Sequence, residues 1–425
     1  MALQVFNPSE ILFRKQVNQW LDNSAVNPMA WPYNAKFDGV TDDSAAIQAA
    51  VDAAITRGGD VYMPAGACLL GSTINLSNVV NIVGAGLGTR FIPASDAIGT
   101  VFNVTGARVG MSDFLLDASS IGSPTFTGIK VDTAGLFKLQ DAWIYGAGTG
   151  IDFPQGNACD FVNIRVQQCP VGILSGGVFD KFPGDTVWMN VVVIPTATGI
   201  AWIMDGNTNA QTMTNCKLIG GAKNLWIRGT GGGSTGGFNS IPDGIFIASG
   251  NFTQTTSYVM QVTKAFNITM DANTFIGAGE IGILIDPAAQ ADVDGITMQG
   301  TKIRANLKEG IRWDSGANLT ASGAQVYGNS QSASGTYSNI FVGADATGLC
   351  QITGCMLGYS SAGVNFANIE GPSSYGLELE AGSLATSGDF LGGLQIVGNT
   401  FIGNTTGTYL DNSVAPSKEI SGNLV

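Results

Sequence analysis

Charged side chains are scarce in this 425-residue chain, yet several acidic ones gather between residues 280 and 314. Lys, Arg, Asp and Glu make up 12% of the residues, about half of the usual ~25%. Hydrolysis of a glycosidic bond needs two carboxylates, about 5 Å apart when the configuration is retained and roughly 6.5–9.5 Å apart when it is inverted. The candidate catalytic residues are therefore Asp286, Asp314, Glu309 and Glu280.

A repeat in the sequence supplies the spacing that such chemistry needs. Asp286 follows Gly282 by four residues, and Asp314 follows Gly310 by four, so both acids occupy the same place in successive copies. Neighbouring strands lie about 4.8 Å apart, so stacked copies would bring the two carboxylates together. One of them would then serve as the general acid and the other as nucleophile or base. A solvated turn with paired charges explains the same residues, and both interpretations stay open.

Basic and aromatic side chains in neighbouring copies could bind a sugar chain. The candidate substrate-binding residues are Arg228, Arg304, Arg312, Trp202 and Trp226. Arg228 takes the place of Asp286 two copies earlier in the chain. Side chains alternate between the two faces of a strand, so some tryptophans of the repeats should face outward and stack on sugar rings. An internal aromatic ladder is the alternative for each of them, and Trp313, next to Asp314, should point inward.

Two further sets of residues could carry different chemistry. A lyase must remove the proton next to a uronate carboxylate and neutralise that carboxylate with a cation. Lys302, Arg304 and Arg312 could form such a set, which we rank below hydrolysis. Glu378 and Glu380 lie on one face of a predicted strand and form a second acidic pair, unless that strand is only an exposed edge.

Composition narrows the possible functions. The chain has no histidine, which removes histidine-based acid–base catalysis and histidine-ligated metal sites; we expect no metal and no cofactor. The net charge of -13 argues against nucleic acid and anionic membranes as partners. The six cysteines form no CxxC pair, and Cys169, Cys216 and Cys355 lie beside apolar positions of the repeat. We predict that these three are buried and unpaired.

The repeat itself runs from Asp141 to Tyr409 in nine copies. Each begins with a turn residue, has an apolar residue three places on, and starts a second short strand at a small turn residue, usually nine or ten residues after the first. The turn residues are Asp141, Asn163, Asn190, Asn215, Asn273, Gly300, Gly323, Gly354 and Asn399. One coil of this size cannot bury its own apolar face, so the repeat predicts a solenoid of about 14 coils, near 70 Å long.

The sequence divides into three segments. Residues 1–33 are predicted to form a short helix and a linker, residues 34–58 to carry a second helix from about Asp43 to Ile55, and residues 59–425 to form the solenoid. The Gly-rich residues 231–237 should form a loop outside the stack. No apolar run reaches the ~18 residues of a membrane span. The N-terminus lacks the order of a signal peptide.

Oligomerisation is predicted from the first helix. Phe13, Val17, Trp20 and Leu21 give it a large apolar surface, and isolated short helices are marginal in water. Three copies could bundle around one axis, so we expect a homotrimer.

The segment that opens the solenoid contains a specific motif. It reads Asn-Ala-Lys-Phe-Asp-Gly-Val-Thr-Asp-Asp from residue 34, followed by Gly-Gly-Asp-Val-Tyr-Met-Pro-Ala-Gly from residue 58. This resembles the opening motif of the pectate-lyase-3-like family, "GDGVTDD…AI..A" followed by "GG.V..P.G.Y". The matching residues are Asp38, Gly39, Thr41, Asp42, Asp43, Ile47, Gly58, Gly59, Val61, Pro64 and Gly66.

The resemblance implies a fold and a function class. The fold is a right-handed parallel β-helix capped at its N-terminal end by the second helix, in an all-β protein. Many members are bacteriophage tailspikes or polysaccharide depolymerases, which implies binding and cleavage of a bacterial capsule, O-antigen or exopolysaccharide. It also implies a trimer in the virion tail, joined to other tail proteins through the N-terminal segment. Asp38, Asp42 and Asp43 are expected to have capping and turn roles. A non-catalytic tail or receptor-binding β-helix and a polysaccharide lyase remain the alternatives.

Overall fold

The computed structural model describes residues 25–133, 135–177, 183–229, 241–277, 279–333, 335–358, 373–384, 393–404 and 406–424. The predicted N-terminal helix and the predicted loop at residues 231–237 lie outside these described residues. Both therefore stay predictions, as does the homotrimer that was argued from the first helix.

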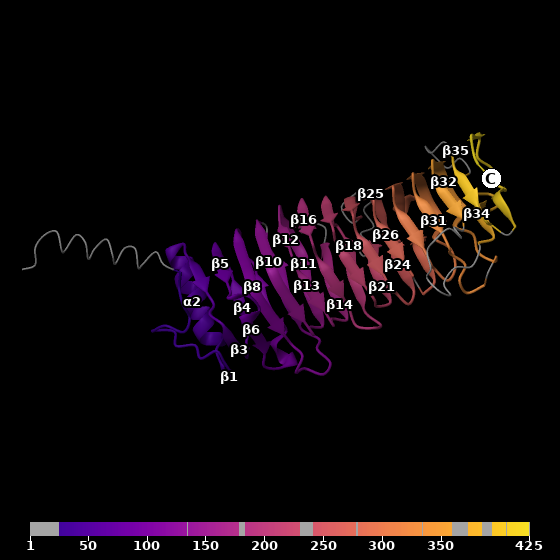
Figure 1. Ribbon diagram of the computed structural model, residues 1–425. Helices are drawn as coiled ribbons and strands as arrows, with labels where there is room; N and C mark the ends of the chain where they lie inside the picture. Colours follow the sequence, from indigo (N-terminus) through magenta and orange to yellow (C-terminus); the bar gives the residue numbers. More distant parts are fainter. Residues whose placement is uncertain are drawn as a thin grey trace, which may run out of the picture.

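The described chain forms one long parallel β-helix of about 13 turns (Figure 1). The rod runs from α2 at its N-terminal end to the last strands at its C-terminal end. Every strand pairing between coils is parallel, and each coil contributes strands to three stacks, here named sheets A, B and C. The predicted all-β parallel β-helix is confirmed, with close to the expected number of coils.

Sheet A holds the candidate site. It consists of β4 (Ile74–Leu76), β7 (Thr100–Val104), β9 (Thr127–Asp132), β11 (Thr149–Asn157), β14 (Val171–Gly177), β18 (Ile200–Gly206), β21 (Lys223–Arg228), β24 (Tyr258–Val262), β27 (Ile281–Ile285), the first residues of β30 (Ile311–Ser322) and β32 (Ile340–Thr353), β34 (Tyr375–Leu379) and β37 (Gly407–Asp411).

Sheet B follows sheet A in each coil. It consists of β2 (Asp60–Tyr62), β5 (Val80–Val83), the first halves of β8 (Val109–Asp117) and β10 (Phe137–Tyr145), β12 (Asp160–Val162), β16 (Thr186–Met189), β19 (Gln211–Thr214), β22 (Asp243–Ala248), β25 (Ala265–Asp271), β28 (Val293–Gln299), the ends of β30 and β32, β35 (Gly393–Val397) and β38 (Ser417–Ser421). The two-residue β15 (Pro183–Gly184) pairs in parallel with the end of β11.

Sheet C completes the coil. It consists of β1 (Asp38–Asp42), β3 (Gly66–Leu70), β6 (Thr89–Pro93), the second halves of β8 and β10, β13 (Arg165–Gln167), β17 (Val192–Ile194), β20 (Lys217–Ile219), β23 (Asn251–Thr253), β26 (Thr274–Ile276), β29 (Lys302–Arg304), β31 (Gln325–Tyr327), β33 (Met356–Gly358) and β36 (Thr400–Ile402).

The first turn residue of the sequence repeat marks the corner between sheets B and C. Asp141, Asn163, Asn190 and Asn215 all have φ between 50° and 57°, a left-handed conformation that Asn and Asp tolerate better than most residues. Their side chains form a ladder, in which each Asn Nδ2 donates to the Oδ1 of the previous coil at 2.7–3.0 Å. This ladder explains why the repeat begins with Asn or Asp in these coils.

Two copies of the repeat are placed one residue too late by the sequence pattern. The left-handed corner residues are Ala272 (φ 50°) and Gly398 (φ 66°), not Asn273 and Asn399. Both asparagines are buried, and each Nδ2 donates to a backbone carbonyl of the preceding coil, at 2.7 Å for Asn273 and 2.8 Å for Asn399. An asparagine in this part of the repeat thus either forms the corner itself or lies inside the rod, where its side chain hydrogen-bonds to the preceding coil.

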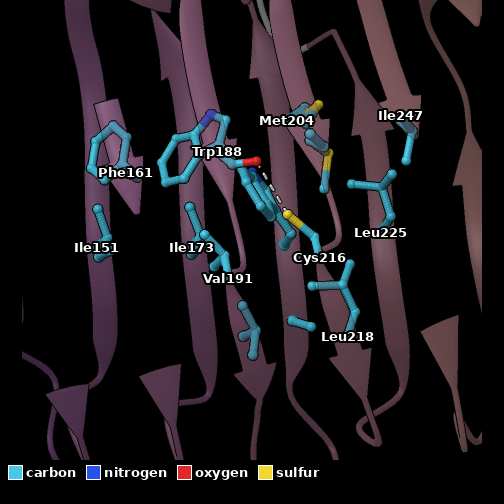
Figure 2. Close-up of a cluster of buried hydrophobic side chains, with 14 of the residues drawn as sticks. Ile151, Phe161, Ile173, Trp188, Val191, Met204, Cys216, Leu218, Leu225 and Ile247 are labelled. Carbon is cyan, nitrogen blue, oxygen red and sulfur yellow. Dashed lines mark hydrogen bonds between the residues drawn. The ribbon is translucent and has the colours of Figure 1, made fainter. Parts of the chain in front are cut away.

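Inward side chains of the three sheets fill the rod with an apolar core (Figure 2). Phe161 stacks on Trp188 with ring centroids 3.7 Å apart, and Trp202 meets Trp188 edge-on at 4.4 Å. Cys216 lies in the same layer and donates its thiol to the Trp188 carbonyl. All six cysteines are buried and unpaired, as predicted for Cys169, Cys216 and Cys355.

The helix α2 (Ser44–Arg57) covers the N-terminal end of the stack and packs against β2, β4 and β5. It buries Ile47, Ala50, Val51 and Ala54, and it ends at Gly58, whose φ of 68° continues the chain in the left-handed region. The predicted second helix is confirmed, two residues longer at its C-terminal end. In the described part of the chain, no helix is both long and apolar enough to cross a membrane.

Asp38, Asp42 and Asp43, here called the acid turn, hold the chain around the start of α2. Asp43 is buried and accepts backbone N–H bonds from Lys36 (2.6 Å) and Phe37 (2.9 Å). Asp38 accepts from the backbone of Val40 and Thr41, and Asp42 accepts from Ser44 and Gly71. The expected turn role is confirmed, but the first turn of α2 is capped through Asp42, since Asp43 makes no side-chain cap bond.

Candidate functional site

One outward-facing column of side chains runs along sheet A. The register of the strands connects one residue in each coil, and most of these residues lie between buried neighbours on their strands. In chain order the column consists of Asn75, Asn103, Lys130, Asp152, Leu174, Ile203, Trp226, Gln261, Leu284, Arg312, Phe341, Glu378 and Leu410. It is polar at the N-terminal end and carries apolar, aromatic and charged groups further along. Ile203 and Leu284 are only 5% exposed, so the accessible groups of the column lie on either side of these two residues.

Glycines at the start of β27 and β30 determine where the predicted acids fall on this surface. A Cβ at Gly282 would lie 2.4 Å from the Gly310 carbonyl oxygen, so no larger residue fits at this close approach of two coils. The register pairs Ile285 with Trp313, and these residues immediately precede Asp286 and Asp314. The two aspartates therefore occupy equivalent places on adjacent coils, as the repeat predicted.

Glu309, Arg312 and Asp314, here called the Arg312 cluster, are held together by one guanidinium. Arg312 Nε donates to both carboxylate oxygens of Asp314, at 2.8 and 2.9 Å, and Nη1 donates to Glu309 Oε1 at 3.3 Å. Since both acids touch one planar guanidinium, their carboxylates are held close together, as a pair of acids in a glycosidase must be.

Glu309 differs from Asp314, the other acid of the cluster, in its burial. Only 4% of the residue is exposed, and its Oε2 atom has no hydrogen-bond partner in the described part of the chain. Burial raises the pKa of Glu309, against the opposing charges of Arg312 and Lys308. A carboxyl group of this kind retains its proton to higher pH than usual, which is the property required of a general acid.

The other two predicted acids lie around this cluster. Asp286 is exposed directly after β27, on the coil next to Asp314. Glu280 is partly exposed and forms a 3.7 Å ion pair with Lys308. Both acids lie near Tyr258. Burial is the main cause that raises the pKa of Tyr258, and the negative charges of Glu280 and Asp286 raise it further. The structure thus brings all four predicted acids to one face of neighbouring coils, with Glu309 the most deeply buried.

A second group on the same face is the Trp226 cluster, which consists of Lys223, Trp226 and Arg228. Lys223 Nζ lies 3.8 Å from the centre of the Trp226 ring, and Arg228 Cζ lies 4.2 Å from it. Lys223 also donates to Gln261 at 2.6 Å, and Arg228 pairs with Asp205 at 3.0 Å. Two cations thus lie over the Trp226 ring, and the predicted contact of Trp226 with a sugar stays a prediction.

Two predicted binding residues are elsewhere. Trp202 is fully buried, and its indole N–H donates to Ser175 Oγ at 3.0 Å, so it belongs to the internal aromatic core. Arg304 lies on β29 in sheet C, where it stacks between Ile276 and Tyr327. The Trp202 assignment is wrong, because burial removes its ring from the surface. The binding role of Arg304 stays a prediction, on a different sheet from Arg312.

Trp313 is 1% exposed and points inward, as predicted. The lyase set does not assemble, because Lys302 shares sheet C with Arg304 whereas Arg312 lies on sheet A.

The second acidic pair is engaged in local contacts. Glu378 accepts a 2.5 Å hydrogen bond from the Ser338 hydroxyl, and Glu380 accepts the backbone N–H of Ala344 at 3.1 Å. Glu378 belongs to the outward column two coils beyond Arg312. It therefore extends the polar surface beside the Arg312 cluster.

Sequence reasoning missed an acidic and basic group nearer the N-terminal end of the column. Lys130 on β9 is in register with Asp152 on β11. Burial raises the pKa of Asp152, opposed by the charge of Lys130 and reinforced by that of Asp132. The available signal was Asp152 two places after Gly150, an outward position at the start of a second strand. Among the described residues, no group of three or more acidic or cysteine side chains could hold a metal ion.

Comparison with known proteins agrees with this architecture. The family model described as rhamnogalacturonase A/epimerase, pectate lyase-like, matches residues 31–128. This chain is a pectate-lyase-like parallel β-helix protein. Within this pectate-lyase-like chain, the matched stretch contains the acid turn, α2 and the first coils, and it ends before the Trp226 and Arg312 clusters.

Curated relatives match only part of this pectate-lyase-like protein. The mannuronan C5-epimerase AlgE1 of Azotobacter vinelandii is 40% identical over 105 residues, which cover 20% of this chain and 7% of the relative. AlgE4 of the same organism is 31% identical over 166 residues, covering 35% of this chain and 26% of the relative. The chain thus spans well under half the length of these relatives.

Two solved structures resemble the pectate-lyase-like protein over nearly its whole length. The A-module of AlgE4 has a TM-score of 0.63 at 19% identity and covers 93% of this chain and 100% of the module. Tailspike protein 3 of bacteriophage CBA120 has a TM-score of 0.65 at 14% identity, covering 96% of this chain and 62% of the tailspike. At these identities the likeness establishes a shared fold.

Proposed function

We propose that this protein binds a bacterial surface polysaccharide along the outward face of sheet A and hydrolyses it at the Arg312 cluster. The observation that carries the proposal is Glu309, a buried carboxyl with a raised pKa whose Oε2 has no partner among the described residues, placed beside a second carboxylate. The solved structures of similar fold include a phage tailspike protein, which supports a polymer on the bacterial surface as the ligand.

The residues of the cluster have distinct roles in this proposal. Glu309 donates its proton to the oxygen of the bond that breaks, as the general acid. Asp314, fixed by the two bonds from Arg312, is the second carboxylate and acts as nucleophile or base. Asp286, on the adjacent coil, adds negative charge next to Asp314, where positive charge develops on the sugar ring. The Arg312 guanidinium holds the acids in register with each other.

The same proposal extends to the setting of the protein. A homotrimer in a virion tail, attached to other tail proteins through the N-terminal segment, would present several copies of sheet A to a polymeric ligand. Light scattering at micromolar concentration tests this part, because a monomer mass would contradict the trimer.

Purified capsule, O-antigen or exopolysaccharide from candidate hosts tests the activity directly. Release of new reducing ends by the wild-type protein, and its loss in Glu309→Gln and Asp314→Asn with retained binding, is the expected result. Full activity in both variants would show that the site is wrong. Binding without cleavage by the wild-type protein would support the alternative, a non-catalytic receptor-binding β-helix.

A second candidate function is a reaction at the carbon next to a uronate carboxylate, by a lyase or an epimerase. It is favoured by the Lys130 and Asp152 group, in which a cation and a partly buried carboxyl with a raised pKa lie on adjacent strands of the same column. The curated relatives named mannuronan C5-epimerases also support it. A lyase product contains a new double bond and absorbs ultraviolet light, whereas hydrolysis gives no such absorbance. Asp152→Asn would abolish this activity and leave Glu309-dependent hydrolysis unchanged.

A further inference from the structure

The Trp226 cluster gathers two positive charges in a protein whose net charge is -13. Lys223 Nζ and Arg228 Cζ lie 3.8 and 4.2 Å from the same ring centre. The Lys223 Nζ and Arg228 Cζ atoms are therefore at most about 8 Å apart, around the Trp226 ring on the face of sheet A. Both are partly exposed, so a ligand on the surface can reach them.

Holding these cations together carries an electrostatic cost that the native contacts offset only in part. Burial lowers the pKa of Lys223, and the charge of Arg228 lowers it further. The hydrogen-bond partner of Lys223, Gln261, is neutral. Arg228 has a carboxylate partner in Asp205. An anion that contacts both Lys223 and Arg228 would reduce their repulsion and accept charge-assisted hydrogen bonds from both.

The position of the cluster relates it to the proposed cleavage site. Trp226, Gln261, Leu284 and Arg312 are successive members of one column. Three steps between coils correspond to about 14 Å, a distance that a few sugar units of an extended chain can span. One polysaccharide chain lying on this column would therefore contact both clusters.

We infer that Lys223 and Arg228, positioned by Trp226, form a subsite for an acidic sugar of the substrate, a few units away from the bond at the Arg312 cluster. The chemistry recognised is an anionic group on a sugar, either a uronate carboxylate or a phosphate ester. This inference rests on the proposed function, because it states the charge of the polysaccharide substrate and the residues that bind the charged group.

Small sugars provide a test that does not require the natural polysaccharide. The indole N–H resonance of Trp226, assigned with Trp226→Phe, is followed by NMR in the full chain during titration with glucuronate, glucose 6-phosphate or glucose at constant ionic strength. A saturable shift with either acidic sugar and none with glucose is the expected result, and the stronger of the two acids identifies the anionic group. Equal responses to glucose and the acidic sugars, or no response to any of them, would overturn the inference.

Variants separate a subsite from general attraction of anions. Lys223→Met and Arg228→Met should each weaken binding of the acidic sugar by about tenfold or more, the loss expected for one charge-assisted hydrogen bond. Arg165→Met is the matched control, because Arg165 lies 5.0 Å over the Trp143 ring on sheet C and has no second cation there in the described contacts. An equal loss in Arg165→Met would contradict the subsite.

Failure of this inference can be distinguished from failure of the proposed function. If the polysaccharide is cleaved in a Glu309-dependent manner but no acidic sugar shifts Trp226, the subsite is wrong and hydrolysis stands. If acidic sugars bind at Trp226 but nothing is cleaved, the subsite stands and the hydrolytic proposal fails.

Discussion

Two regions of this molecule gather carboxylates, and their surroundings differ. In the acid turn at the start of α2, the oxygens of Asp38, Asp42 and Asp43 accept bonds from neighbouring backbone N–H groups. Bonds from Thr41 and Val40 lower the pKa of Asp38, and bonds from Ser44 lower that of Asp42. In the Arg312 cluster, burial raises the pKa of Glu309, and one of its oxygens has no described partner.

The difference separates structural acids from candidate catalytic ones. A carboxylate that accepts several backbone bonds is stabilised in its charged form, which fixes a loop but leaves no proton to donate. A buried carboxyl with an unsatisfied oxygen is costly for the fold, and it holds a proton that chemistry can use. The acid turn should therefore control stability, and the Arg312 cluster should control activity.

The largest expected effect is on activity. Glu309→Gln removes the proposed acid while keeping a similar shape, so turnover of the polysaccharide should fall about 10²–10⁴-fold. Thermal unfolding should stay unchanged or move to higher temperature, because the substitution removes a buried ionisable group. Glu280→Gln, which alters only a partly exposed ion pair with Lys308, is the control and should retain most of the activity. A Glu309→Gln variant that loses stability but keeps normal turnover would show that Glu309 is a structural acid and not a catalytic one.

The next effect is on stability. Asp43→Ala leaves the backbone N–H groups of Lys36 and Phe37 without their acceptor, which should lower the free energy of unfolding by about 3 kcal/mol. Activity per folded molecule should be unchanged, since the acid turn lies many coils from Arg312. Urea unfolding measures the loss, and a large drop in turnover of the folded fraction would count against a purely structural role.

The pH dependence of turnover follows from the direction of the Glu309 shift. A general acid must be protonated, so activity falls as pH rises through its pKa. Because this pKa is raised, the fall should occur above the ordinary glutamate value of about 4.3. A pH profile of kcat measures it, and the residual activity of Glu309→Gln should lack this fall. A profile that rises with pH across the same region would contradict the assignment of Glu309 as the acid.

The smallest effect concerns the pH dependence of stability at the acid turn. The pKa of Asp42 is lowered in the folded protein, so at acidic pH the unfolded chain binds more protons than the folded protein does. Its stabilising contribution is present above the unfolded value of about 3.9 and is lost as pH falls through the folded pKa. Asp42→Asn should therefore lower the melting temperature at pH 6 more than at pH 3. An equal loss at both values would show that charge at Asp42 is unimportant.

The sequence was sufficient for the architecture because a β-helix repeats its constraints in every coil. Corner residues such as Asn163 and Asn190, and closely packed glycines such as Gly282 and Gly310, recur at fixed spacing. That spacing predicted the solenoid, the cysteine burial and the equivalent places of Asp286 and Asp314. The same spacing placed the corner at Asn273, one residue too late, because a buried asparagine and a corner asparagine cannot be distinguished in the sequence.

The tertiary structure decided which side chains can act. Periodicity assigns a residue to a coil, but only the packed coils show that Trp202 points into the core and that Arg304 lies on sheet C. Burial of Glu309 likewise depends on Arg312 and on neighbouring coils that cover it. The sequence alone therefore determined the rod and the row of acids, because both follow from local repetition. The raised pKa of Glu309 and the pair of cations at Trp226 arise from contacts among several residues, which no local pattern encodes.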